Sequence, residues 1–109
     1  MSRLRFAHAA QNDLLEIQKY IVEELENSMS AYDILKKIAK RIRILEDFPQ
    51  SGSPLSTIVG FETAYRFLVC GNYLAFYKVE DDDVFIVRIL YNRRDYLKIL
   101  FNGLPENNE

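Results

Sequence analysis

The chain has 109 residues, of which 49% are hydrophobic and 13% aromatic, and its formal net charge is −2 at pH 7. This length fits one domain with its own core, and the apolar content excludes a disordered chain. Because the charges nearly balance, the protein as a whole does not attract nucleic acid electrostatically, and any phosphate-binding face has to be a local cluster of positive charge. We expect a single domain over residues 1–104 and a frayed tail over residues 105–109.

Several classes of site are excluded by what the sequence lacks. Cys70 is the only cysteine, which rules out an intramolecular disulfide and a cysteine-based zinc site. His8 is the only histidine, and no catalytic triad or phosphate-binding loop is visible. No apolar run approaches the ~20 residues of a membrane span, and the first residues lack the apolar segment of a signal peptide. We therefore expect a cytoplasmic protein with no membrane association, no metal and no cofactor.

The N-terminal half has the pattern of a short strand followed by two helices. Residues 3–6 alternate polar and apolar, and residues 9–27 repeat apolar side chains at helical spacing. A second helix is predicted from a cap at Ser30 to near Phe48, because Pro49 disfavours helical geometry in the residue before it. The side of this helix opposite its apolar stripe is interpreted as a solvated face, and it carries Lys36, Lys37, Lys40, Arg41 and Arg43.

Strand-like periodicity begins after a loop over residues 49–54. Three segments rich in aromatic and β-branched side chains follow, which is typical of a meander. Gly71 and Asn72 separate the first two segments, and glycine at the first position favours a type II′ hairpin turn. The three strands are expected at residues 65–69, 73–79 and 84–90.

An acidic run and a final amphipathic segment complete the pattern. Residues 80–83 reverse the chain, and because they lack the glycine and spacing of a calcium loop we interpret them as a solvated turn. Residues 96–101 have a helical or irregular amphipathic pattern. The predicted class is α+β, with two N-terminal helices packed on a mostly antiparallel sheet of three or four strands, in the order β-α-α-β-β-β with a possible short C-terminal helix.

Basic and aromatic residues gather near the end of the last predicted strand. Arg66 lies in the first strand of the meander, Arg88 in the third, and Arg93 and Arg94 just past its end, with tyrosines between them. Guanidinium groups match phosphates and aromatic faces stack on bases, so such a set is able to bind nucleic acid. It is equally able to form structural ion pairs, for instance with Asp95, or to dock an acidic partner segment. From residue types alone the structural interpretation is favoured.

Five sequence motifs extend these observations along most of the chain: Asp13-Leu14-x-Glu16-Ile17-x-x-Tyr20-Ile21, Ile42-x-x-Leu45-x-x-Phe48-Pro49-x-x-Gly52-x-Pro54-Leu55, Arg66, Asn72-Tyr73-x-x-x-Tyr77 and Val87-Arg88-Ile89-Leu90-Tyr91-x-Arg93-Arg94-Asp95-Tyr96. In their order and spacing they resemble the RelE/ParE superfamily of bacterial toxins over residues 4–101. The resemblance implies the toxin of a type II toxin–antitoxin pair. Such a toxin is neutralised, as a hetero-oligomer, by a cognate antitoxin encoded beside it.

The superfamily contains two mechanisms, and the first is enzymatic. RelE-like members are ribosome-dependent endonucleases that cut mRNA in the decoding site. For that reaction, the resemblance implies that Arg66, Arg88 and Arg93 supply positive charge to the developing phosphorane. Tyr91 would be the remaining catalytic residue, since it stands where many relatives have histidine. A tyrosine with a pKa near ~10 is a poor base at neutral pH.

The second mechanism belongs to the ParE-like, plasmid-stabilisation branch, whose members poison DNA gyrase and are not known as enzymes. Leu68 and Leu74 favour this branch, because some RelE relatives have basic residues at these positions. The acidic net charge and the pattern of the opening helix favour it too. We expect the target to be bound by Arg93, Arg94 and Tyr96. The endonuclease and a non-toxic relative that only binds an antitoxin are the alternatives, so the sequence leaves open whether the chain is an enzyme.

Overall fold

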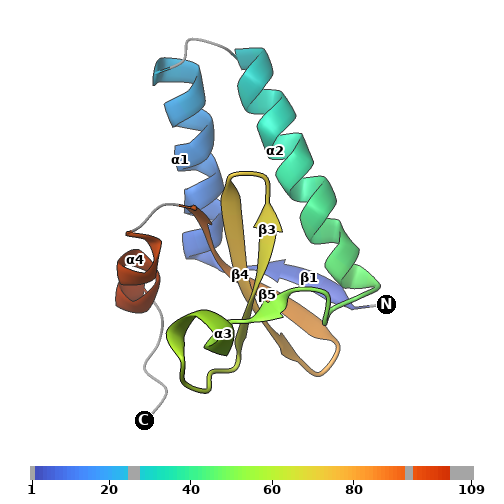
Figure 1. The fold of residues 1–109 in the computed structure, drawn as a ribbon. Helices are drawn as coiled ribbons and strands as arrows, with labels where there is room; N and C mark the ends of the chain where they lie inside the picture. Colours follow the sequence, from blue (N-terminus) through green and yellow to red (C-terminus); the bar gives the residue numbers. More distant parts are fainter. Residues whose placement is uncertain (1, 25–27, 93–94, 104–109) are drawn as a thin grey trace.

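The computed structural model describes residues 2–24, 28–92 and 95–103. A hairpin of two long helices lies along one side of a single sheet, and two short helices lie on the other side (Figure 1). The elements in chain order are β1 (Arg3–Phe6), α1 (His8–Glu24), α2 (Ser28–Arg43), η1 (Ile44–Glu46), β2 (Ser53–Pro54), α3 (Ser56–Val59), β3 (Tyr65–Cys70), β4 (Tyr73–Glu80), β5 (Asp83–Tyr91) and α4 (Tyr96–Gly103).

The sheet has the strand order β1-β5-β4-β3-β2. Strands β3, β4 and β5 form the predicted antiparallel meander, and β1 pairs in parallel with β5 at one edge. The predicted α+β class with a mostly antiparallel sheet is confirmed. The strand count is five rather than three or four, because the two-residue β2 adds to the other edge through its pairing with β3.

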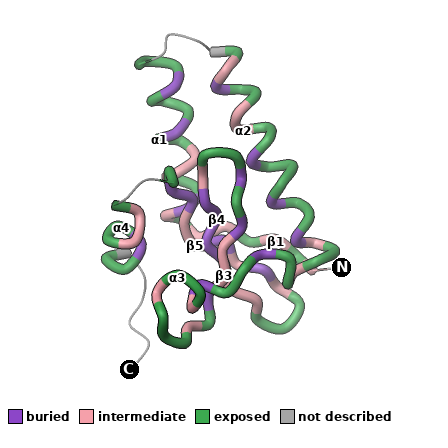
Figure 2. The backbone as a smooth tube through the Cα atoms, in the orientation of Figure 1, coloured by how far each residue is buried: buried purple, intermediate pink, exposed green. Residues whose placement is uncertain are grey.

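Two apolar cores lie on opposite faces of the sheet. Alternation along β3 and β4 places Leu68 and Ala75 under the helical hairpin and Phe67 and Phe76 on the other face. Figure 2 shows the buried positions running along the inner sides of α1 and α2. The helical stripes that contact the first core include Ala10, Ile17, Ile21, Ala31, Ile38 and Ile42. The second core is covered by Leu55, the residue just before α3, and by Leu100 of α4.

Several element boundaries differ from the prediction. Helix α2 begins at Ser28, so Ser30 lies inside its first turn and the predicted cap position is wrong. The second helix was predicted to end near Phe48, but α2 ends at Arg43 and the 3₁₀ turn η1 carries the chain only to Glu46. The helical segment thus ends before the residue that Pro49 restricts. The four-residue α3 was not predicted. The C-terminal helix is confirmed, whereas the predicted end of the first helix at Asn27 and the tail over 105–109 lie outside the described residues.

The two hairpin turns of the meander are both tight. Gly71 has φ +63°, as the first central position of a type II′ turn requires. Strands β4 and β5 extend to Glu80 and Asp83, so the acidic reversal is shorter than predicted, with Asp81 in the left-handed region at φ 54°. Asp83 accepts a hydrogen bond from Arg3 Nε at 2.9 Å, so this carboxylate belongs to an ion pair rather than to a solvated turn. No helix in the described ranges is long and apolar enough to cross a membrane.

Candidate functional site

Arg88 is the most firmly held of the predicted site residues. Its Nε and Nη2 donate to the two carboxylate oxygens of Asp13 on α1, both at 2.8 Å. The backbone N–H of Ile89 donates to the same carboxylate at 2.9 Å. A register shift against β4 leaves Val87 as the extra residue of a bulge just before these two donors. The hydrogen bond that Arg88 donates to Asp13 raises the pKa of Arg88 above its ordinary value. The pair is a bidentate tie between helix and sheet.

Arg66 is also held by internal partners, in this case backbone carbonyls. Its Nη2 donates to Gly52 O at 2.8 Å and to Gln50 O at 3.1 Å, and its Nε reaches Gly52 O at 3.2 Å. These bonds fix the loop between η1 and β2 against the start of β3. The guanidinium therefore donates hydrogen bonds to loop carbonyls that lie outside the backbone hydrogen bonding of the sheet.

The same loop is held from its other side by Tyr77. The Gly52 N–H donates to the Tyr77 hydroxyl at 2.9 Å, and that hydroxyl donates to Pro49 O at 2.8 Å. A Cβ on Gly52 would lie 2.6 Å from both Phe67 O and the Tyr77 hydroxyl oxygen, which leaves no space for a side chain. The motif Pro49-x-x-Gly52, Arg66 and Tyr77 thus form one structural unit, which we call the loop clamp.

The remaining predicted residues differ in their surroundings. Tyr91 is 44% exposed, and its ring lies 5.3 Å from the Tyr73 ring. Tyr96 is half-buried and stacks on Phe76 at 6.0 Å within the second core, so its ring is a packing element. Arg93 and Arg94 lie outside the described residues.

A large groove lies between the helical hairpin and the end of the sheet where β5 finishes. Its volume is about 1530 Å³, beyond the ~300–1,000 Å³ of typical small-molecule pockets. Tyr91 and Asp95 line it, which places it at the end of the sheet where the sequence predicted a working surface. Its lining also includes Glu16, Ile17, Tyr20, Ile21, Ile34, Lys37, Ile38, Arg41, Val69, Cys70, Gly71, Asn72, Tyr73, Ile89 and Leu90.

The groove combines an apolar floor with charged rims. Lys37 and Arg41 lie on the α2 side, and Arg41 Nε donates to Val69 O at 3.0 Å. Glu16 lies on the α1 side. Burial, reinforced by the neighbouring Tyr91 and Tyr20, raises the pKa of Tyr73, so its hydroxyl stays protonated. A protein segment with apolar and charged side chains suits this surface better than a small polar ligand.

The groove floor was missed by sequence reasoning because its isoleucines repeat at the spacing of an ordinary core stripe. Ile17 and Ile21 do contact the first core, but they also line the groove. The available signal was Tyr20, a large side chain beside the stripe that is 58% exposed in the structure. Exposed aromatic residues next to an apolar stripe are typical of binding surfaces.

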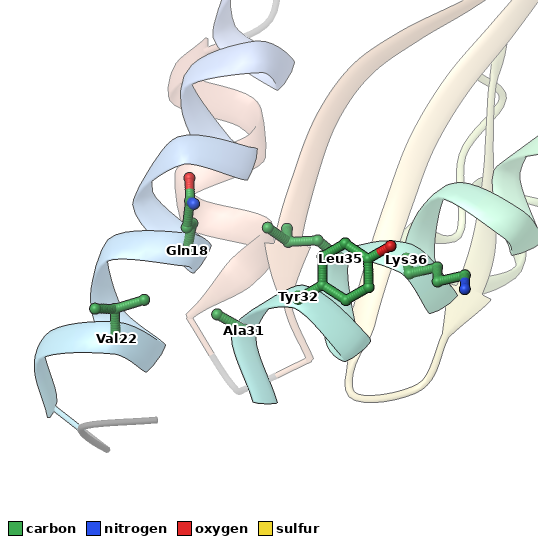
Figure 3. A pocket seen from close by; sticks show the side chains of 6 residues that line it. All are labelled: Gln18, Val22, Ala31, Tyr32, Leu35 and Lys36. Atoms are coloured by element: carbon green, nitrogen blue, oxygen red, sulfur yellow. The ribbon is translucent and has the colours of Figure 1, made fainter. Parts of the chain in front are cut away.

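A second, smaller crevice lies between α1 and α2 (Figure 3). Ala31 and Leu35 of α2 point toward α1, where Gln18 and Val22 complete the lining. Lys36 extends in the other direction, with its ammonium 5.8 Å from the centre of the Tyr32 ring. Of its described lining residues, Gln18 and Lys36 have strongly polar side chains, and these point in different directions (Figure 3). This lining does not form the convergent polar set of a ligand site.

Comparisons with known proteins agree with this architecture. Residues 4–96 match the family model described as the ParE toxin of the type II toxin–antitoxin system parDE. The structure is similar to one from a chromosomal ParDE toxin–antitoxin system of P. aeruginosa, with a TM-score of 0.71 and 21% sequence identity. That match covers 85% of this chain and 98% of the other, and it shows a shared fold. No curated protein matches the sequence.

Proposed function

We propose a specific mode of action for this chain, which belongs to the ParE toxin family of type II toxin–antitoxin systems. It inhibits DNA gyrase by binding it, without catalysing a reaction, and a cognate antitoxin neutralises it in a hetero-oligomer. The family membership confirms the resemblance found in the sequence, while the gyrase target and the absence of catalysis are the proposal.

The internal binding of two arginines is the observation that carries this proposal. RNA cleavage needs cations that contact the phosphate in the transition state. Arg88 gives its donors to Asp13, and Arg66 gives its donors to the loop carbonyls. Moving Arg88 onto a phosphate would leave a largely buried carboxylate without its cation, which is strongly unfavourable. Both arginines therefore support the scaffold of a binding protein rather than a nuclease site.

The groove supports the antitoxin part of the proposal. An amphipathic segment can lay its apolar face on the isoleucine floor, as helices do in other hydrophobic grooves. Lys37 and Arg41 on the α2 rim favour acidic side chains on that flank of the segment. An antitoxin bound in this way would cover Tyr20 and Tyr91, the two most exposed aromatic residues of the groove.

Arg93 and Arg94 remain the proposed contacts with gyrase. We expect Arg93→Ala and Arg94→Ala each to reduce toxicity while changing the free energy of unfolding by less than ~0.5 kcal/mol. Tyr96→Ala is expected to destabilise the chain instead, because its ring packs on Phe76. A reduced melting temperature for the arginine variants would assign them a structural role.

Controlled expression of the chain in bacteria tests the mode of action. We expect DNA replication to stop and the DNA-damage response to begin while bulk translation continues and cellular messages stay intact. Codon-positioned cuts in messages on translating ribosomes would instead establish the RelE-like endonuclease. Harmless expression of the folded chain without a partner would establish a non-toxic relative that only binds an antitoxin.

A further inference from the structure

Helix α2 carries a strong local positive charge on an acidic protein. Between Ser28 and Arg43 it has five cations and one carboxylate, Asp33. Its net charge is therefore +4, and since the whole chain carries −2 the remainder carries −6. None of the five cations forms an ion pair with a carboxylate in the described ranges; Arg41 bonds a backbone carbonyl and Lys36 lies near an aromatic ring. This charge is available to an external anion.

Three of these cations form a ridge on the side of α2 that faces away from the core. Lys36, Lys40 and Arg43 follow one another at intervals of four and three residues, which places them along one line, about 6 Å and about 4.5 Å apart along the helix axis. All three are exposed, whereas Ile38 and Ile42 on the opposite side are buried. Figure 3 shows Lys36 extending away from α1. We call Lys36, Lys40 and Arg43 the cationic ridge.

The composition of this surface distinguishes between two kinds of anionic partner. Between residues 36 and 43 every exposed residue is cationic except Ala39. A protein partner needs an apolar contact core, which the groove provides and this convex ridge lacks. Contacts to a phosphate backbone need only positive charge and are independent of sequence. Tyr32, one turn before Lys36, is exposed, but between residues 36 and 43 no large apolar side chain is exposed. This stretch of regularly spaced cations therefore matches nucleic acid rather than an acidic peptide.

We infer that the cationic ridge binds the phosphate backbone of duplex DNA. This goes beyond the proposed action on gyrase and does not depend on it, because the ridge is complete in this chain alone. If the chain binds an enzyme that itself holds DNA, the cationic ridge would also contact that DNA. The interpretation of the basic side of α2 as a merely solvated face is then replaced by a sequence-independent binding surface.

Fluorescence anisotropy of a labelled DNA duplex of about 20 base pairs, titrated with the full chain, tests this inference. Contacts to three or four phosphates predict that log K falls with log salt concentration with a slope of about −3. The double variant K36E/K40E should weaken binding at least tenfold. The matched control K19E/K98E makes the same change in net charge at exposed lysines of α1 and α4 and should change binding by less than about twofold.

Four outcomes would overturn the inference. They are no binding at low salt, an equal loss in the two double variants, tighter binding of duplex RNA than of DNA, and displacement of the DNA by polyglutamate at lower concentration than by unlabelled duplex. Circular dichroism confirms that each variant is folded. If K36E/K40E unfolds, K36Q/K40Q replaces it and should still weaken binding relative to K19Q/K98Q.

Discussion

Arg88 on β5 contacts both carboxylate oxygens of Asp13 on α1, at 2.8 Å each, and ties the first helix to an interior strand of the sheet. The side chains of Arg88 and Asp13 are only 17% and 12% exposed, so the pair is screened less than a surface ion pair. The tie orients α1, whose next turns supply Glu16 and Tyr20 to the groove. The arrangement of the groove thus depends on a polar contact outside the apolar core.

We predict that Asp13→Ala lowers the free energy of unfolding by about 3 kcal/mol. The substitution leaves the Arg88 guanidinium and the Ile89 N–H without their acceptor in a largely buried place. Urea unfolding followed by circular dichroism measures the change. Glu16→Ala, on the same helix and exposed, is the control and should change stability by less than ~0.5 kcal/mol. Equal effects of the two substitutions would contradict the assigned role of Asp13.

The loop clamp gives a second prediction, which concerns Gly52 and Tyr77. Gly52→Ala should cost about 1–3 kcal/mol, because its Cβ would collide with the backbone oxygen of Phe67 and with the Tyr77 hydroxyl. Tyr77→Phe should cost a similar ~1–3 kcal/mol, because it leaves the Gly52 N–H and the Pro49 carbonyl unpaired. Thermal unfolding of the single and double variants measures both. Strict additivity in the double variant would show that the two residues do not act as one unit.

Acid pH should weaken the tie between β1 and β5. Hydrogen bonds from Arg3, followed by its charge, hold the pKa of Asp83 below its ordinary value. Because the pKa of Asp83 is lower in the folded than in the unfolded state, its ionised carboxylate stabilises the fold at pH values above the unfolded-state pKa of about 3.9. This stabilisation is lost as the pH falls through the folded-state pKa. The stability difference between the wild type and Asp83→Asn, measured by urea unfolding, should therefore shrink below about pH 4. A difference that grows on acidification would contradict this assignment.

The thiol of Cys70 should be unreactive in the folded protein. Burial raises its pKa to about 11, and the thiolate is the form that reacts. Modification by a thiol reagent at mildly alkaline pH should be slow in the native state and fast in denaturant. Rapid native labelling would show that Cys70, which also lines the groove, is open to solvent.

Periodicity and turn chemistry were sufficient to predict most of the fold. Proline at position 49, glycine at 71 and the helical stripe that includes Ile38 and Ile42 act locally, so they are visible in sequence. The parallel addition of β1 to β5 and the two-residue β2 depend on contacts between distant segments, which one sequence does not show.

The candidate site was only partly predictable for the same reason. Residue types alone favoured a structural interpretation of the arginines, and the structure places Arg66 and Arg88 in internal contacts. The partners of these two residues, a loop carbonyl and a carboxylate on α1, lie far from them in sequence. The groove was not predicted because a side chain that lines it and one that fills the core have the same helical spacing.

Supercoiling of relaxed plasmid by purified gyrase, with increasing amounts of the purified chain, is the most direct test of the proposed action. We predict loss of supercoiling that saturates with toxin and is reversed by the cognate antitoxin. In a parallel reaction with the same amounts of the chain, an mRNA on translating ribosomes should stay intact. Full supercoiling at saturating toxin, accompanied by cleavage of the message, would contradict the account.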